Sequence, residues 1–123
     1  MELESSALPS IRRVVAMLRR HTQLRLSLEA HCGIEPDADW AVRFTRRRCM
    51  SVRRAMERIA DTESGATGSL RGRLRTRAWG NSRPLVWETG DEGGKANRRV
   101  EIYLALGEGD DAFEAPKRRR ITE

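Results

Sequence analysis

The spacing of apolar residues changes repeatedly along this chain, and that change constrains the fold more than any other feature. Between residues 10 and 20, apolar side chains recur every three or four positions, which is the period of one helix face. They alternate with polar residues over 23–30, as in a strand with one buried face, and return to the helical period over 39–60. Alternation resumes over 71–79 and again over 98–106. The order helix, strand, helix, strand, strand predicts an α/β layer, in which helices cover one face of a mixed sheet.

Residues that start, fill or separate these elements refine the prediction. Ser10 is the expected N-cap of the first helix, and Asp37 or Asp39 that of the second. Gly, Ser and Thr residues mark a loop over 61–68, and glycines with a proline mark a longer loop over 80–96. The expected buried stripe of the second helix comprises Ala41, Phe44, Cys49, Val52, Met56 and Ile59. The outer face of the strand at 71–79 is expected to be arginine throughout, comprising Arg73, Arg75 and Arg77.

Composition sets outer limits on what the chain can be. Its 123 residues suffice for one domain with a single core, and aromatics at 5% require that core to be mostly aliphatic. No apolar run reaches the length of a membrane span, and the N-terminus lacks a signal-peptide core. We expect a folded domain over 1–106, followed by a charged and disordered tail over 107–123.

Charge and cysteine content narrow the classes of function. The net charge of +6 is compatible with nucleic acid as a partner. Sheets that bind nucleic acid use aromatic side chains as a platform, however, and here the outward strand positions are Arg and Tyr103, which disfavours nucleic-acid binding. Cys32 and Cys49 form neither a disulfide framework nor a zinc motif, so we expect no metal and no cofactor. No catalytic arrangement of side chains is recognisable. We therefore expect a binding or structural domain and not an enzyme.

Four motifs follow one another in a familiar order. His31-Cys32-Gly33 ends the strand at 23–30, and Phe44-Thr45 leads at helical spacing to Arg48 and Val52. Gly80 with Pro84 comes next, and then the run Asn97-Arg98-Arg99-Val100-Glu101-Ile102. This order resembles the OmpA-like (OmpA C-terminal, MotB-type) peptidoglycan-binding domain family, over roughly residues 5–106. The resemblance is strongest from Asn97 to Ile102.

The resemblance implies a fold, a ligand and a site. The family's fold is a βαβαββ α+β sandwich, whose first strand would be shortened here to a stub at Met1–Glu4. In its members, an Asp after the strand binds the ammonium of a peptidoglycan stem-peptide amino acid, and a helix Arg binds the carboxylate. Carried onto this chain, the ligand-binding residues are Arg48, Asn97, Arg98, His31, Cys32 and Gly33. The ammonium-binding Asp is replaced by Gly33 and a family Asn by Ala41, so we expect ligand binding that is weakened or redirected.

Several alternatives stay open at this level. Arg48 either binds a ligand carboxylate or forms a salt bridge with a carboxylate of the protein. Asn97 and Arg98 either contact ligand or order the 80–96 loop through bonds to its backbone. The domain as a whole could be a structural or interaction subunit of a larger assembly. The family usually works in the periplasm or at the outer membrane, whereas the missing export signal is expected of a cytoplasmic protein or a piece of a longer one.

Overall fold

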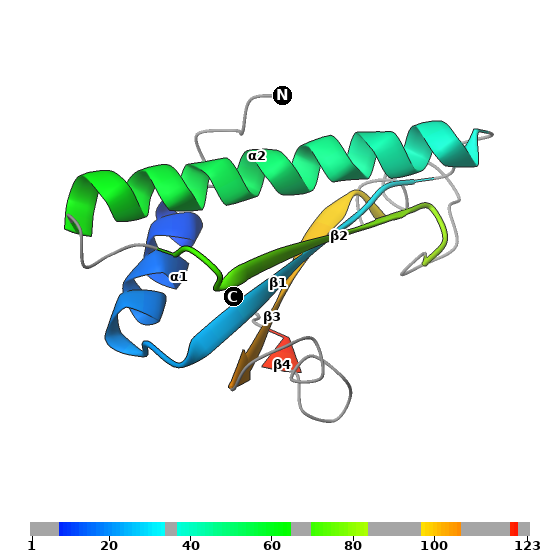
Figure 1. Cartoon of the computed structure of the whole chain (residues 1–123). Coiled ribbons are helices and arrows are strands. Elements are labelled where there is room, and N and C mark those ends of the chain that lie inside the picture. The colour runs from blue at the N-terminus through cyan, green and yellow to red at the C-terminus, as the bar shows by residue number, and fades with distance from the viewer. Residues whose placement is uncertain (1–7, 34–36, 65–69, 84–96, 107–118, 121–123) are drawn as a thin grey trace.

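The computed structural model describes residues 8–33, 37–64, 70–83, 97–106 and 119–120 (Figure 1). This part of the chain forms two helices and four strands: α1 (Leu8–Arg20), β1 (Leu24–His31), α2 (Ala38–Ser64), β2 (Leu74–Gly80), β3 (Arg99–Leu106) and β4 (Arg119–Arg120). The predicted order of helix, strand, helix, strand, strand is confirmed as far as β3. The sequence pattern did not predict β4, which is only two residues long.

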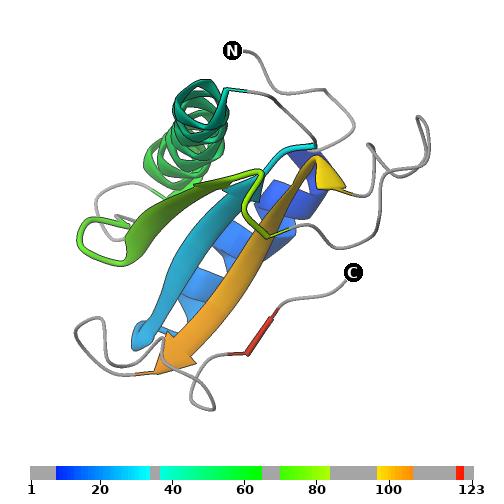
Figure 2. The same cartoon turned by 90° about the vertical axis from the view of Figure 1, so that its right-hand side faces the viewer.

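The strands form one mixed sheet in the order β2–β1–β3–β4. β1 runs parallel to β2 and antiparallel to β3, and β4 is antiparallel to β3. Both helices pack on the same face of this sheet, and among the described residues the opposite face carries no helix (Figures 1 and 2). The predicted fold class, two main helices on one face of a mixed sheet, is therefore confirmed.

Two predictions concern the ends of the chain. The strand stub at 1–4 lies outside the described residues. Of the tail predicted at 107–123, only β4 is described: Arg119 pairs with Leu104 and Arg120 pairs with Tyr103. The division into a domain and a tail therefore stays a prediction.

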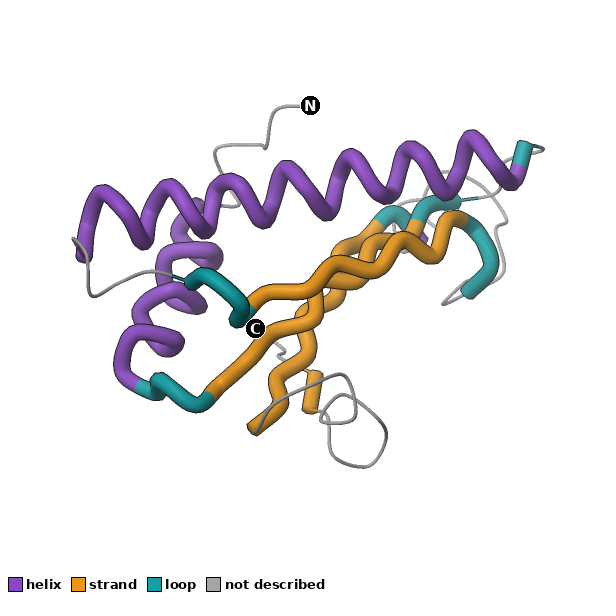
Figure 3. The backbone as a smooth tube through the Cα atoms, in the orientation of Figure 1, coloured by secondary structure: helices purple, strands orange, loops and turns teal. Residues whose placement is uncertain are grey.

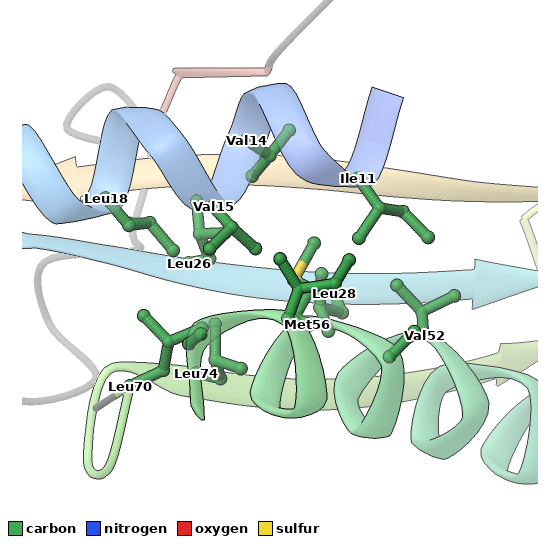
Figure 4. Packing of buried hydrophobic residues seen from close by; sticks show 13 residues of the cluster. Ile11, Val14, Val15, Leu18, Leu26, Leu28, Val52, Met56, Leu70 and Leu74 are labelled. Carbon is green, nitrogen blue, oxygen red and sulfur yellow. The ribbon is translucent and has the colours of Figure 1, made fainter. Parts of the chain in front are cut away.

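An aliphatic core fills the space between the helices and the sheet (Figure 4). The whole predicted stripe of α1 is buried, comprising Ile11, Val14, Val15 and Leu18. Leu26 and Leu28 meet it from β1, and Val52 and Met56 from α2. Leu18, Leu26, Leu28 and Met56 are among the largest fully buried side chains. The two periodicities in the sequence thus select the residues that form this core.

The start of α1 differs from the prediction, and its end is held by a distant arginine whose role the sequence pattern missed. The helix begins at Leu8, so Pro9 lies in its first turn, where a proline is tolerated, and the prediction of Ser10 as N-cap is wrong. At the other end, Arg73 donates from Nη2 to the carbonyls of Leu18 at 2.8 Å and His21 at 2.7 Å. Its Nε donates to the carbonyl of Leu24 at 3.0 Å, which ties the end of α1 to β1. Arg73 thus satisfies carbonyls that a helix end leaves without partners.

α2 runs along the sheet (Figure 3), and its start has an identifiable cause. Asp37 is its N-cap, because Asp37 Oδ1 accepts the backbone N–H of Trp40 at 3.0 Å. The helix continues to Ser64, so the loop predicted from 61 begins too early. In its last turns, Thr62 Oγ1 donates to the carbonyl of Arg58 at 2.8 Å. Neither described helix is long and apolar enough to span a bilayer.

Candidate functional site

Three segments meet at the edge of the sheet where β1 and β2 end and β3 begins. His31, the last residue of β1, pairs with Gly80 on one side and Arg99 on the other. The backbone N–H of Cys32 donates to the carbonyl of Gly80 at 2.9 Å, which extends this junction past the end of β1. The register therefore brings residues 31–33 and 97–98 to one edge, and only Arg48 of the predicted site lies elsewhere, on α2.

Gly80 joins this edge to the first turns of α2. Its N–H donates to Thr45 Oγ1 at 3.1 Å, and that hydroxyl in turn donates to the carbonyl of Ala41 at 3.0 Å. Gly80 has a φ of +60°, and a Cβ built on it would lie 3.2 Å from the backbone nitrogen of Val42. The end of β2 therefore lies directly against the α2 backbone, an approach that a residue with a side chain would disturb.

Arg48 lies on the half-buried flank of α2 one turn before Val52. The next residue, Cys49, is fully buried and donates from Sγ to the carbonyls of Leu28 and Arg77, each at 3.3 Å. These two bonds hold that turn of α2 over β1 and β2. No carboxylate among the described residues forms a salt bridge with Arg48. The protein salt bridge considered as an alternative is thus not found in the described part of the chain.

Both cysteines are buried, and neither is part of a disulfide. Burial raises the pKa of the Cys49 thiol to about 11, so it stays protonated at neutral pH and is a poor nucleophile. No group of three or more His, Cys, Asp or Glu side chains that could hold a metal ion occurs within the described ranges. Cys49 therefore acts as a small packing residue that also donates two hydrogen bonds.

The helix-free face of the sheet carries a buried polar network. Glu29 of β1 stands directly opposite Glu101 of β3, and the two are only 1% and 8% exposed. Trp79 Nε1 donates to Glu29 Oε1 at 2.8 Å and Ser27 Oγ donates to Glu29 Oε2 at 2.9 Å. Arg75 Nε in turn donates to Ser27 Oγ at 2.9 Å. The prediction that β1 has one buried face is therefore wrong, because these neighbours cover its polar face as well.

His31 belongs to this network. Its Nε2 lies 3.0 Å from Glu101 Oε1, although the ring N–H is not aligned as a hydrogen bond, and Arg99 Nε lies 3.5 Å from Glu101 Oε2. Burial, and after it the charge of Arg99, lowers the pKa of His31 below its usual value of 6.5, which favours the neutral ring. His31 follows Glu29 on the helix-free face, whereas Arg48 lies on the helix-covered side of the sheet. The structure therefore separates these two predicted site residues.

The residues before β3 divide into a buried and an open part. Asn97 is 1% exposed, and its carbonyl accepts Arg99 Nη1 at 3.4 Å. Arg99 Nη2 also donates to the carbonyl of Arg83 at 3.1 Å, so Arg99 links β3 to the chain after β2. Arg98 is exposed and Gly33 is half-exposed. Asn97 is therefore inaccessible, and Arg98 and Gly33 are the accessible residues of this edge.

The sequence reasoning missed the parts played by Arg99, Glu29 and Glu101. A usable signal was present: two neighbouring strands each place a glutamate among apolar residues, and arginines occupy nearby positions of β2 and β3. A charged residue in a strand is rarely buried unless it is paired. Opposite charges on adjacent strands therefore predict a paired, buried network at this position.

Comparison with known proteins gives matches to solved structures alone. No protein-family model matches the sequence, and no curated protein matches it. The periplasmic domain of Helicobacter pylori MotB matches with a TM-score of 0.69 at 14% identity, over 88% of this chain and 67% of that chain. The peptidoglycan-associated lipoprotein from Burkholderia pseudomallei gives a TM-score of 0.64 at 15% identity, over 85% and 79%. A MotB-like protein from Desulfovibrio vulgaris matches with a TM-score of 0.67 at 22% identity, over 86% of this chain and 66% of that chain.

These matches cover most of this chain but leave a fifth to a third of each solved chain unmatched. At such low identity they show the fold alone. The chain has the OmpA-like fold, as its sequence motifs predicted.

Proposed function

We propose that this chain, a divergent OmpA-like domain, is a non-enzymatic binding domain for a carboxylate-bearing ligand related to the peptidoglycan stem peptide. The observation that carries the proposal is Arg48: it is half-buried and has no salt-bridge partner among the described residues. It also occupies the helix position where the family places its carboxylate-binding arginine. One protein of the same fold, the Burkholderia pseudomallei lipoprotein, is named for its association with peptidoglycan.

The chemistry of Arg48 favours a carboxylate as its partner. A guanidinium is planar and always charged, and its paired N–H groups match the two oxygens of a carboxylate. A partly buried charge is costly without a counter-charge, so a ligand that supplies one gains affinity. Arg98 is exposed just before β3 and adds a second accessible positive charge. Anionic groups are therefore preferred at Arg48.

The ammonium of a free amino acid lacks its usual partner in this site. Gly33 stands where the family has its ammonium-binding Asp and offers no side chain. Asp37, the next acidic side chain that the structure describes after Gly33, already accepts the Trp40 N–H as an N-cap. The proposed ligand is thus recognised through its carboxylate, and a free ammonium next to Arg48 weakens binding by repulsion.

Calorimetric titration of the full chain with pimelate and with meso-diaminopimelate tests the proposal. The two compounds share a carbon skeleton and two carboxylates, and only the second carries two ammonium groups. We expect pimelate to bind several-fold more tightly, because Arg48 and Arg98 attract carboxylates and Gly33 cannot hold an ammonium. Dimethyl pimelate, which lacks both charges, is the matched control and should not bind.

Two results would contradict the proposal. Binding of meso-diaminopimelate at least as tight as that of pimelate would mean that an ammonium site exists after all. Equal binding of pimelate and its dimethyl ester would mean that no carboxylate is recognised.

A further inference from the structure

Trp40 and Phe44 form a stacked aromatic pair on the N-terminal part of α2. Their ring centroids are 5.1 Å apart and the ring planes differ by 15°. Trp40 is 38% exposed, and only Leu106 joins it as an exposed large apolar side chain in the described part of the chain. In a chain with six aromatic residues, a pair held at the surface is an unusual use of them. Apolar surface exposed in this way marks a binding site more often than an isolated side chain does.

The pair lies on the same flank of α2 as Arg48. Trp40, Phe44 and Arg48 are spaced at i, i+4 and i+8, and residues four apart lie one above another on a helix. At 1.5 Å per residue, Trp40 and Arg48 are about 12 Å apart along the axis. An aromatic face and a carboxylate-binding cation therefore stand in line on one side of the proposed site.

The backbone of Trp40 is fixed by the helix cap, and its ring is supported by a second ring. Its backbone N–H is bound by the N-cap Asp37 at 3.0 Å, and the half-buried Phe44 backs its ring. A ring fixed in this way loses little conformational freedom when a second ring stacks on it. The π-face of indole is electron-rich and attracts C–H groups that carry partial positive charge. The aliphatic C–H face of a pyranose sugar has this character.

We propose that Trp40, backed by Phe44, is a stacking platform for the sugar ring of a muramyl peptide whose carboxylate binds Arg48. The inference rests on the proposed function and extends it from a carboxylate to a glycopeptide. The length of such a ligand matches the separation of Trp40 and Arg48. The lactyl group and two amino acids that join a muramyl ring to a terminal carboxylate span about 10 Å when extended. A ligand of this kind is acylated at every nitrogen, so it does not need the ammonium-binding Asp that Gly33 replaces.

A pair of probes that differ only in the sugar tests this inference by calorimetry on the full chain. N-acetylmuramyl-L-alanyl-D-isoglutamine carries the ring, and N-acetyl-L-alanyl-D-isoglutamine lacks it; neither has an ammonium. We expect the wild-type protein to bind the glycopeptide roughly tenfold more tightly, which is the scale of one ring stacked on an aromatic side chain. Trp40→Ala should remove that advantage and leave the affinity for the plain dipeptide unchanged.

Two further variants make the test specific. Trp40→Phe should retain most of the advantage, because a flat ring remains. Leu106→Ala removes the other exposed apolar side chain, at the far end of β3 opposite Leu24, and should change neither affinity. Equal binding of both probes by the wild type would overturn this inference alone and leave the carboxylate site standing. An equal loss for both probes in Trp40→Ala would also overturn it, and failure of the wild type to bind either probe would overturn it together with the proposed function.

Discussion

Gly80→Ala is expected to lower the free energy of unfolding by about 3 kcal/mol, a large share of the ~5–15 kcal/mol typical of a domain. Two effects add at this position. The backbone φ of +60° costs an alanine about 1–2 kcal/mol. The new methyl group would lie 3.2 Å from Val42 N and 3.3 Å from the carbonyl carbon of Ala41, and such overpacking costs about 1–3 kcal/mol.

Gly72→Ala is the matched control for this prediction. Gly72 also has a positive φ, of +74°, but no heavy atom lies within 4 Å of its built Cβ. Gly72→Ala should therefore lower the free energy of unfolding only by the backbone contribution, about 1 kcal/mol. Urea denaturation followed by circular dichroism measures both values. Equal losses for the two variants would show that the close approach of Gly80 to α2 does not contribute to stability.

Gly33→Asp is expected to raise the affinity for meso-diaminopimelate about tenfold. The new carboxylate restores a partner for the ammonium, and a charge-assisted hydrogen bond contributes about 1.5–3 kcal/mol. We expect the lower of these two values because Ala41 stands where the family has an Asn, so a second ligand contact is lost. The described glycines with positive φ are Gly72 and Gly80, so Asp at position 33 requires no left-handed backbone.

The neutral variant Gly33→Asn separates charge from shape in this experiment. It should bind meso-diaminopimelate no better than the wild type, and Gly33→Asp should bind pimelate more weakly because like charges repel. A well-folded Gly33→Asp protein with unchanged affinity for meso-diaminopimelate would show that the edge around Gly33 has been rebuilt for a different ligand.

The helices and strands could be predicted because the apolar residues of each recur at one regular period. In α1 every residue of the predicted stripe is buried. In β1 Leu26 and Leu28 are buried as predicted, whereas Leu24 is only partly buried. Element ends were less predictable, because they depend on single contacts. The predicted cap Ser10 lies inside α1, and the end of α1 is held by Arg73, some fifty residues away in the sequence.

The candidate site was less predictable than the fold because it combines segments whose side chains point to different faces. Motif order placed His31 and Arg48 in one site, but strand alternation directs His31 to the helix-free face. The burial of Asn97 depends on tertiary packing that spacing cannot reveal. Phe44 fitted the buried stripe of α2, yet it is only half-buried and stacks on Trp40.

The affinity of Arg48→Gln for pimelate tests the central claim most directly, measured by calorimetry beside Arg47→Gln. Arg47 is the adjacent residue on α2 and is exposed, so its variant loses the same charge outside the proposed site. We expect a ten- to hundredfold loss of affinity for Arg48→Gln, the value of a hydrogen-bonded charge pair, and almost none for Arg47→Gln. Equal affinities in the two variants would show that pimelate is held by the general positive charge of the domain, and the carboxylate site at Arg48 would be refuted.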